Sequence, residues 1–250
     1  MTLPETFLTK PLAHRGLHDL QSGRIENSLS AVQAAVANGY GIEVDLQLTR
    51  DGEAMVFHDA MLDRLTGETG YVRKRSRADL ERVNYRGGPG RIPALETVLD
   101  AVAGRAPLLL EIKDQDGTLG DDVGPLEEAV ARAIEAYRGP LAVMSFNPHS
   151  VRLMAHLCPE VPRGLTTSSY AEMFWPEVPA PTRDRLREIP DYDAVGACFI
   201  SHEVADLARP RVAELKADGA AILCWTVRSE RQEAKAREVA HNITFEGYAA

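Results

Sequence analysis

Short apolar segments alternate with amphipathic segments along the whole chain, and this alternation limits the possible folds more than any other feature. The apolar segments span five to eight residues and resemble buried strands, whereas the segments between them carry apolar residues at helical spacing. Strand–helix alternation predicts parallel strands joined by right-handed crossovers. The predicted strands are Pro11–Gly16, Gly41–Leu48, Ala54–His58, Leu108–Lys113, Leu141–Phe146, Arg163–Thr167, Val195–Ser201, Ala221–Val227 and His241–Phe245.

The predicted helices have clear start and end signals. Pro148 and Pro210 suit a first helical turn, and Gly39, Gly139 and Gly219 suit the position just after a last turn. The predicted helices are Leu29–Asn38, capped by Asn27 or Ser28, and Leu95–Ala103, Leu126–Tyr137, Pro148–Leu157, Arg183–Ile189, Pro210–Asp218 and Glu230–Val239.

These elements favour a closed barrel. If Ala54–His58 pairs antiparallel with the preceding strand, eight main strands remain, which is the number that closes a (β/α)8 TIM barrel of about 250 residues. An open doubly wound sheet is the alternative, but the chain lacks a glycine-rich strand–turn–helix fingerprint. The glycine- and charge-rich segment 60–93 interrupts the alternation. We therefore expect one domain over residues 1–250, with a small inserted subdomain after the second strand at about residues 60–93.

Composition excludes several classes of protein. With 28 basic and 37 acidic residues, the net charge is −9, which disfavours nucleic acid as a partner because such binding neutralises phosphates with Lys and Arg. No apolar stretch approaches the roughly 18 residues of a membrane span, and no secretory signal is evident. Cys158, Cys198 and Cys224 form no metal or disulfide pattern and suit a core. We expect a cytoplasmic protein; the oligomeric state is not indicated.

Polar residues at the ends of predicted strands are the candidate functional residues, because strands of a parallel sheet are otherwise apolar. Glu43 and Asp45 are two residues apart, as are Glu111 and Lys113, so each pair shares one face of its strand. The carboxyl ends of barrel strands form one rim. The residues concerned are His14, Arg15, Glu43, Asp45, His58, Asp59, Glu111 and Lys113.

Their chemistry favours a phosphodiester as substrate. Glu43, Asp45 and Glu111 offer hard oxygen ligands that suit one divalent cation, Mg²⁺ or Ca²⁺. With such a cation and two basic side chains, the site carries a small positive excess that matches a monoanion, and two histidines supply an acid and a base. Taken singly, each feature is more often a solvated strand edge, a structural ion pair or an ordinary polar histidine, and only their combination at one rim indicates an active site.

The chain resembles the glycerophosphodiester phosphodiesterase family in a series of motifs that covers most of its length. The most specific are His14-Arg15-Gly16, Glu26-Asn27-Ser28, Gly41-Ile42-Glu43-Val44-Asp45, Thr49-Arg50-Asp51-Gly52 and Val56-Phe57-His58-Asp59. Further matches are Leu62, Arg64, Thr66, Gly70, Ile92-Pro93-Ala94-Leu95, Glu111-Ile112-Lys113, Ser145-Phe146 and Trp225-Thr226-Val227.

The resemblance implies a barrel that hydrolyses glycerophosphodiesters to sn-glycerol 3-phosphate and an alcohol. For the chemistry we expect attack by the glycerol 2-hydroxyl through a cyclic glycerol phosphate, with direct attack by water as the competing route. It implies metal ligation by Glu43, Asp45 and Glu111 and catalysis by His14 and His58. It also implies phosphate binding by Arg15 and Lys113, with Phe146 and Trp225 as apolar walls for the substrate.

Two other functions remain open. One is phospholipase-like cleavage of lysophospholipid head groups, which would favour an exposed apolar rim, and the other is non-catalytic phosphodiester binding. The alcohol is expected to meet loops such as Thr167–Pro181, where Tyr170, Phe174 and Trp175 either contact it or only pack.

The last strand departs from the family pattern. Family members often carry Thr-Asp followed by Pro there, whereas this chain reads Asn242-Ile243-Thr244-Phe245-Glu246-Gly247, with Phe245 in place of the Asp. The detail of the rim at this strand is therefore open.

Overall fold

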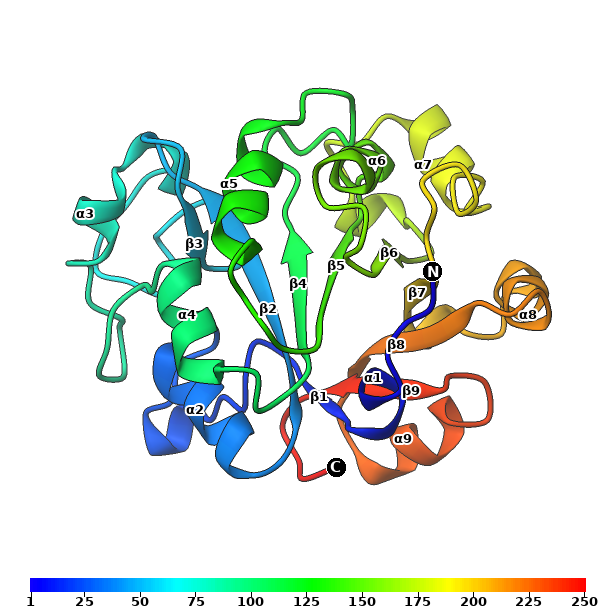
Figure 1. Cartoon of the computed structure of the whole chain (residues 1–250), viewed down its shortest axis with the longest axis horizontal. Coiled ribbons are helices and arrows are strands. Elements are labelled where there is room, and N and C mark those ends of the chain that lie inside the picture. Colours follow the sequence, from blue (N-terminus) through cyan, green and yellow to red (C-terminus); the bar gives the residue numbers. More distant parts are fainter.

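Eight parallel strands close into a barrel in the computed structural model, which describes residues 1–250 (Figure 1). Each strand pairs with its neighbours in chain order, and β1 pairs with both β2 and β9, so that the first and last strands lie side by side. The short β3 runs antiparallel to β2 outside this ring. The strands are β1 (Leu12–Ala13), β2 (Gly41–Leu48), β3 (Ala54–Val56), β4 (Leu108–Ile112), β5 (Leu141–Ser145), β6 (Arg163–Thr167), β7 (Phe199–Glu203), β8 (Ala221–Val227) and β9 (Asn242–Phe245). The TIM-barrel prediction is confirmed.

Helices surround the barrel, and α1 (Thr6–Thr9) precedes β1. Phe7 of α1 is fully buried against residues of the barrel interior such as Leu109 and Phe199. The other α-helices are α2 (Leu29–Ala37), α3 (Arg77–Leu80), α4 (Leu95–Val102), α5 (Pro125–Ile134), α6 (Pro148–Leu157), α7 (Ala180–Leu186), α8 (Pro210–Ala217) and α9 (Glu230–Ala236). Four 3₁₀ turns complete the set: η1 (Leu20–Ser22), η2 (Val72–Lys74), η3 (Glu172–Phe174) and η4 (Val204–Asp206). None of these helices is both long and apolar enough to cross a membrane.

The two faces of a barrel strand lie in different surroundings. In β2, Ile42, Val44 and Leu46 belong to the main apolar cluster between the strands and the helices, whereas Glu43 and Asp45 alternate with them and line a cavity. This division follows from the two-residue repeat of a strand, which sends successive side chains to opposite faces.

Several element boundaries differ from the sequence predictions, and local backbone geometry explains three of the differences. The first strand ends at Ala13 because Arg15 and Gly16 have positive φ angles of 54° and 75°. Val195 lies in a turn, where its N–H bonds to the Asp191 carbonyl, so the seventh strand starts only at Phe199. The α7 helix stops at Leu186, three residues before Ile189 with φ 48°.

Residues 60–93 lie beside β3, with η2 and α3 at the periphery of the molecule (Figure 1). Leu62, Leu80 and Ile92 of this segment form a second apolar cluster with Met55 and Phe57. The segment therefore has a small core of its own that is anchored on β3.

Candidate functional site

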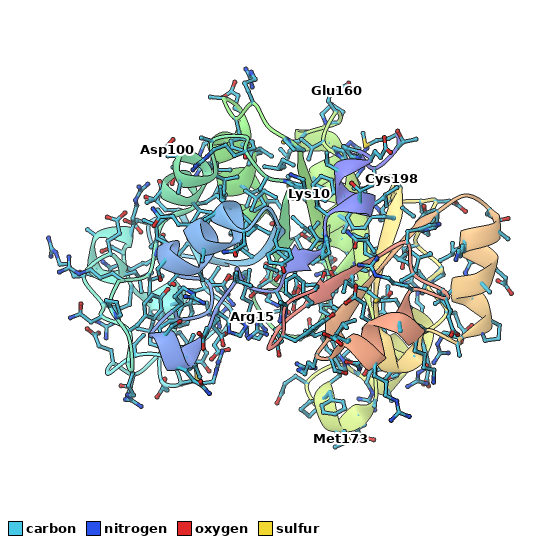
Figure 2. The ribbon with its side chains drawn as sticks, turned by 90° about the horizontal axis from the view of Figure 1, so that it is seen from below. Lys10, Arg15, Asp100, Glu160, Met173 and Cys198 are labelled. Atoms are coloured by element: carbon cyan, nitrogen blue, oxygen red, sulfur yellow. The ribbon has the colours of Figure 1, made fainter.

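A cavity of about 740 Å³ opens at the carboxyl ends of the strands. In Figure 2, Arg15 and Met173 lie toward this end, and Lys10 and Cys198, which precede or begin strands, lie toward the other. The nine residues to which the family resemblance gives a role line this one cavity: His14, Arg15, Glu43, Asp45, His58, Glu111, Lys113, Phe146 and Trp225. Asp59, the other candidate at a strand end, lines it as well.

Three buried carboxylates form the floor of the cavity. Asp45 of β2 is the register partner of Glu111 of β4, and Glu43 precedes Asp45 by two residues on the same face. One oxygen from each of the three acids lies within 4.8 Å of the others, and all three residues are at most 6% exposed. Adjacent parallel strands in register thus bring together acids that are far apart in sequence.

Without a further cation, the negative charges of these three carboxylates are not fully balanced. Burial, together with the charges of Asp45 and Glu111, raises the pKa of Glu43 well above its ordinary value. Although burial opposes ionisation, the charge of Lys113 and the other nearby cations hold the pKa of Asp45 well below its ordinary value. Three hard oxygen donors with this repulsion fit a divalent cation such as Mg²⁺ or Ca²⁺.

Two cationic side chains lie against the carboxylates. The Lys113 ammonium is 2.8 Å from Asp45 Oδ1 and also donates to Glu111. Arg15 pairs with Glu26 at 2.6 Å, and its Nε is 3.4 Å from Asp45 Oδ2. The left-handed conformation of Arg15 also aims its main-chain N–H at Glu43 Oε2, 2.9 Å away.

Asn27 holds Asp45 in place. Its amide donates to Asp45 Oδ2 at 2.8 Å, and its Oδ1 accepts the Asp45 main-chain N–H at 3.2 Å. Ser28, the other residue considered as a helix cap, caps α2 by accepting the Ala31 N–H. Ser28 is therefore the cap of α2, whereas Asn27 binds the carboxylate of Asp45.

Each of the two histidines has a carboxylate at its Nδ1 atom. His58 Nδ1 is 2.7 Å from Asp59 Oδ1, and His14 Nδ1 is 2.5 Å from Glu246 Oε2. The other ring nitrogen of His14 lies 4.0 Å from Glu43 Oε2, at the edge of the acidic cluster. Burial lowers the pKa of His14 despite its hydrogen bond with Glu246.

Arg64 connects the two sides of the site. It donates to both Asp59 oxygens, at 2.6 and 2.9 Å, and to Glu26, which also binds Arg15. Although burial opposes ionisation, the hydrogen bonds from His58 and Arg64 hold the pKa of Asp59 well below its ordinary value.

Aromatic side chains form another wall of the cavity. The Phe146 ring lies 4.7 Å from that of Trp175 and 5.5 Å from that of Trp225, centroid to centroid. The Trp225 indole N–H donates to the Ser201 carbonyl at 3.0 Å. Phe174 lines the mouth and is 68% exposed.

Several residues at the site carried no local signal in the sequence. Glu203 lines the cavity from the end of β7, where its carboxylate accepts two hydrogen bonds from Ser169. His18 lies in the loop after β1, 3.5 Å from Glu246. In the sequence, Glu246 stands out only as part of a departure from the family pattern. Its contact with His14 depends on barrel closure, because β1 pairs with β9.

Fold and site together define a TIM barrel with one cavity in which carboxylates, cationic side chains and histidines converge. Comparison with known proteins gives the family: the glycerophosphoryl diester phosphodiesterase family profile matches residues 14–242. The chain belongs to this family, as its motifs indicated, and it is a phosphoric diester hydrolase.

Individual relatives resemble the chain over most of its length. It is 30% identical over 237 residues to a glycerophosphodiester phosphodiesterase of Bacillus altitudinis, covering 90% of this chain and 89% of the relative. It is 27% identical over 251 residues to a glycerophosphodiester phosphodiesterase of Bacillus subtilis (strain 168), covering 91% and 78%. The structure of an Oleispira antarctica phosphodiesterase in complex with the product sn-glycerol-3-phosphate superposes with a TM-score of 0.78, at 23% identity, over 96% of this chain and 94% of that one.

Proposed function

We propose that this enzyme hydrolyses glycerophosphodiesters to sn-glycerol 3-phosphate and an alcohol. The proposal rests on one observation. Three buried carboxylates, two cationic side chains and two histidines with carboxylate partners converge in one cavity. The Bacillus altitudinis relative bears the name of this activity, and the Oleispira antarctica phosphodiesterase holds the corresponding product.

Glu43, Asp45 and Glu111 are proposed to hold one divalent cation, Mg²⁺ or Ca²⁺. Their donor atoms are all carboxylate oxygens, and the raised pKa of Glu43 reflects its burial and its repulsion by Asp45 and Glu111, which a cation would relieve. When bound, such an ion supplies Lewis-acid polarisation of the phosphoryl group and orients the substrate.

Arg15 and Lys113 are proposed to bind the phosphoryl oxygens. Both side chains line the cavity next to the carboxylates, so they also face an anion that enters it. Their fixed positive charges stabilise the additional negative charge that develops on phosphorus-bound oxygens in the transition state.

His14 and His58 are proposed to exchange the protons of the reaction. One histidine accepts the proton of the glycerol 2-hydroxyl as this oxygen attacks phosphorus, and the other donates a proton to the departing alcohol. The P–O bond to the alcohol breaks and a cyclic glycerol phosphate forms. Water then opens the ring while the histidines reverse their roles. In both histidines the Nδ1 atom is already occupied by a carboxylate, which leaves Nε2 for these transfers.

The direct test is hydrolysis of glycerophosphocholine by the full chain with Mg²⁺ or Ca²⁺ and with chelator. We expect release of choline and sn-glycerol 3-phosphate that stops with chelator. Absence of hydrolysis with either ion would refute the function and favour a phosphodiester-binding barrel. A substrate analogue that lacks the 2-hydroxyl distinguishes this route from direct attack by water on phosphorus, because its fast hydrolysis would exclude the cyclic intermediate.

A second candidate function is cleavage of lysophospholipid head groups. An apolar rim has no signature in the sequence, but the structure exposes Met61, Met173 and Phe174 by 41%, 78% and 68%. Met61 and Phe174 line the cavity mouth, where an acyl chain would find apolar contacts. Faster turnover of lysophosphatidylcholine than of glycerophosphocholine would favour this alternative.

We also propose a cytoplasmic location. Cys158, Cys198 and Cys224 are unpaired thiols, and free thiols are typical of reducing compartments.

A further inference from the structure

Glu246 follows β9 directly and has three partners. Its Oε2 lies 2.5 Å from His14 Nδ1 and 3.5 Å from His18 Nε2, and its Oε1 accepts from Arg228 Nε at 2.8 Å. Arg15 and Lys113, the cationic side chains beside the three acids, are not among these partners. The carboxylate is therefore committed to a catalytic-site histidine and to two side chains that hold it there.

Barrel closure explains why this residue reaches His14. Ala13 of β1 is the register partner of Phe245 of β9, and the His14 N–H bonds to the Phe245 carbonyl at 2.9 Å. Phe245 is buried beside Tyr40 in the main apolar cluster. The next residue, Glu246, extends from the strand end toward His14. The departure at the last strand thus combines an apolar core position with a carboxylate one residue later.

The same arrangement occurs at the other histidine. Asp59 binds His58 through Nδ1, as Glu246 binds His14. A carboxylate at Nδ1 favours the tautomer with the proton on that atom and keeps the ring in one orientation. For His14 the remaining nitrogen then faces Glu43, 4.0 Å away at the edge of the acidic cluster.

We propose that Glu246 is the positioning residue for His14: it accepts the Nδ1–H and so directs Nε2 at the reacting group. This role rests on the proposed function. His18 and Arg228 keep the carboxylate in place. Removal of the equivalent buried carboxylate in serine proteases costs about 10⁴ in kcat. Because the Glu246 side chain is 20% exposed and water can partly replace it, we expect a smaller loss, of about 10–100-fold.

The test compares kcat and KM of Glu246→Gln in the wild-type and His14→Ala backgrounds. In the variant, the amide oxygen can still accept from Arg228, which leaves its NH₂ to face Nδ1 and favours the wrong tautomer. We expect kcat to fall about 10–100-fold with KM within about twofold, and no further fall in the His14→Ala background. A full additional loss in that background, or no loss in either, would overturn the proposal.

Glu233→Gln is the matched control. Glu233 anchors the same C-terminal segment by accepting from the Tyr248 hydroxyl at 2.9 Å, but it has no contact with His14. We expect its kcat to stay within about twofold of wild type. An equal loss in Glu233→Gln and Glu246→Gln would show that both act only by holding the chain terminus, against the proposal.

A readout without substrate separates this proposal from the enzymatic function. Nitrogen-15 NMR of histidine-labelled protein, assigned with His14→Ala, reports the tautomer of His14. We expect the Nδ1–H form in the wild type and a shift toward Nε2–H in Glu246→Gln. An Nε2–H form in the wild type would refute the positioning role, whereas a protein with the expected tautomer but no hydrolysis would refute only the proposed function.

Discussion

Replacing Glu43 by Gln should stabilise the metal-free protein while removing its response to divalent cations. The three acids lie within 4.8 Å of one another, and two unit charges at this distance repel by about 3–4 kcal/mol at an effective dielectric constant of about 20. The attraction of Lys113 and Arg15 offsets much of this repulsion. We therefore expect Glu43→Gln to raise the free energy of unfolding without metal by about 1–2 kcal/mol, or the Tm by about 2–8 °C.

With metal bound, the wild type should be more stable than Glu43→Gln. A ligand present at 100 times its Kd stabilises the folded wild type by about 2.7 kcal/mol, and a variant with only two of the three carboxylates should lose most of that gain. The assay is thermal denaturation in chelator and in a concentration series of Mg²⁺ or Ca²⁺. Glu127→Gln, which changes a buried acid at the start of α5 that does not line the cavity, should keep the full metal response.

The pH dependence follows from the direction of the Glu43 shift. Its folded-state pKa is raised above the ordinary 4.5, so the destabilisation is complete above the raised pKa and vanishes below about 4.5. In chelator, the advantage of Glu43→Gln should therefore shrink as the pH falls through this window. A Glu43→Gln protein that is less stable than wild type without metal, or that keeps the wild-type metal response, would refute the reasoning.

Three further predictions test other parts of the site. His58→Ala should lower kcat by about 10²–10⁴ with little change in Tm, and near-wild-type turnover would remove His58 from the mechanism. Gly16→Ala should lower the free energy of unfolding by about 2 kcal/mol or more, because φ is 75° and the new Cβ would lie 2.8 Å from the Ala31 carbonyl carbon; an unchanged denaturant midpoint would contradict this. Arg64→Met should lower kcat several-fold by releasing Asp59, yet leave Tm nearly unchanged because Arg64 is 46% exposed; a large fall in Tm with normal kcat would show a structural role only.

The strand segments and the acidic cluster could be predicted because their signals are local. A strand's two-residue repeat places Glu43 with Asp45 on one face, and the same repeat places Glu111 with Lys113. Counting eight strands then implied closure, and closure implied a common rim. Where positive φ angles at Arg15 and Gly16 end β1 early, apolar pattern alone predicted too long a strand.

The amino-acid sequence by itself thus determined the barrel, its family and the polar side chains at the strand ends that line the cavity. Only the tertiary structure decided which carboxylate contacts His14 Nδ1. Glu246 lies 232 residues away and reaches His14 through the pairing of β1 with β9. The tertiary structure also decided that Phe146, Trp175 and Trp225 share one wall, since these rings come from three separate segments. Side-chain alternation is a property of one strand, whereas contacts between distant segments depend on how the closed ring sets their register.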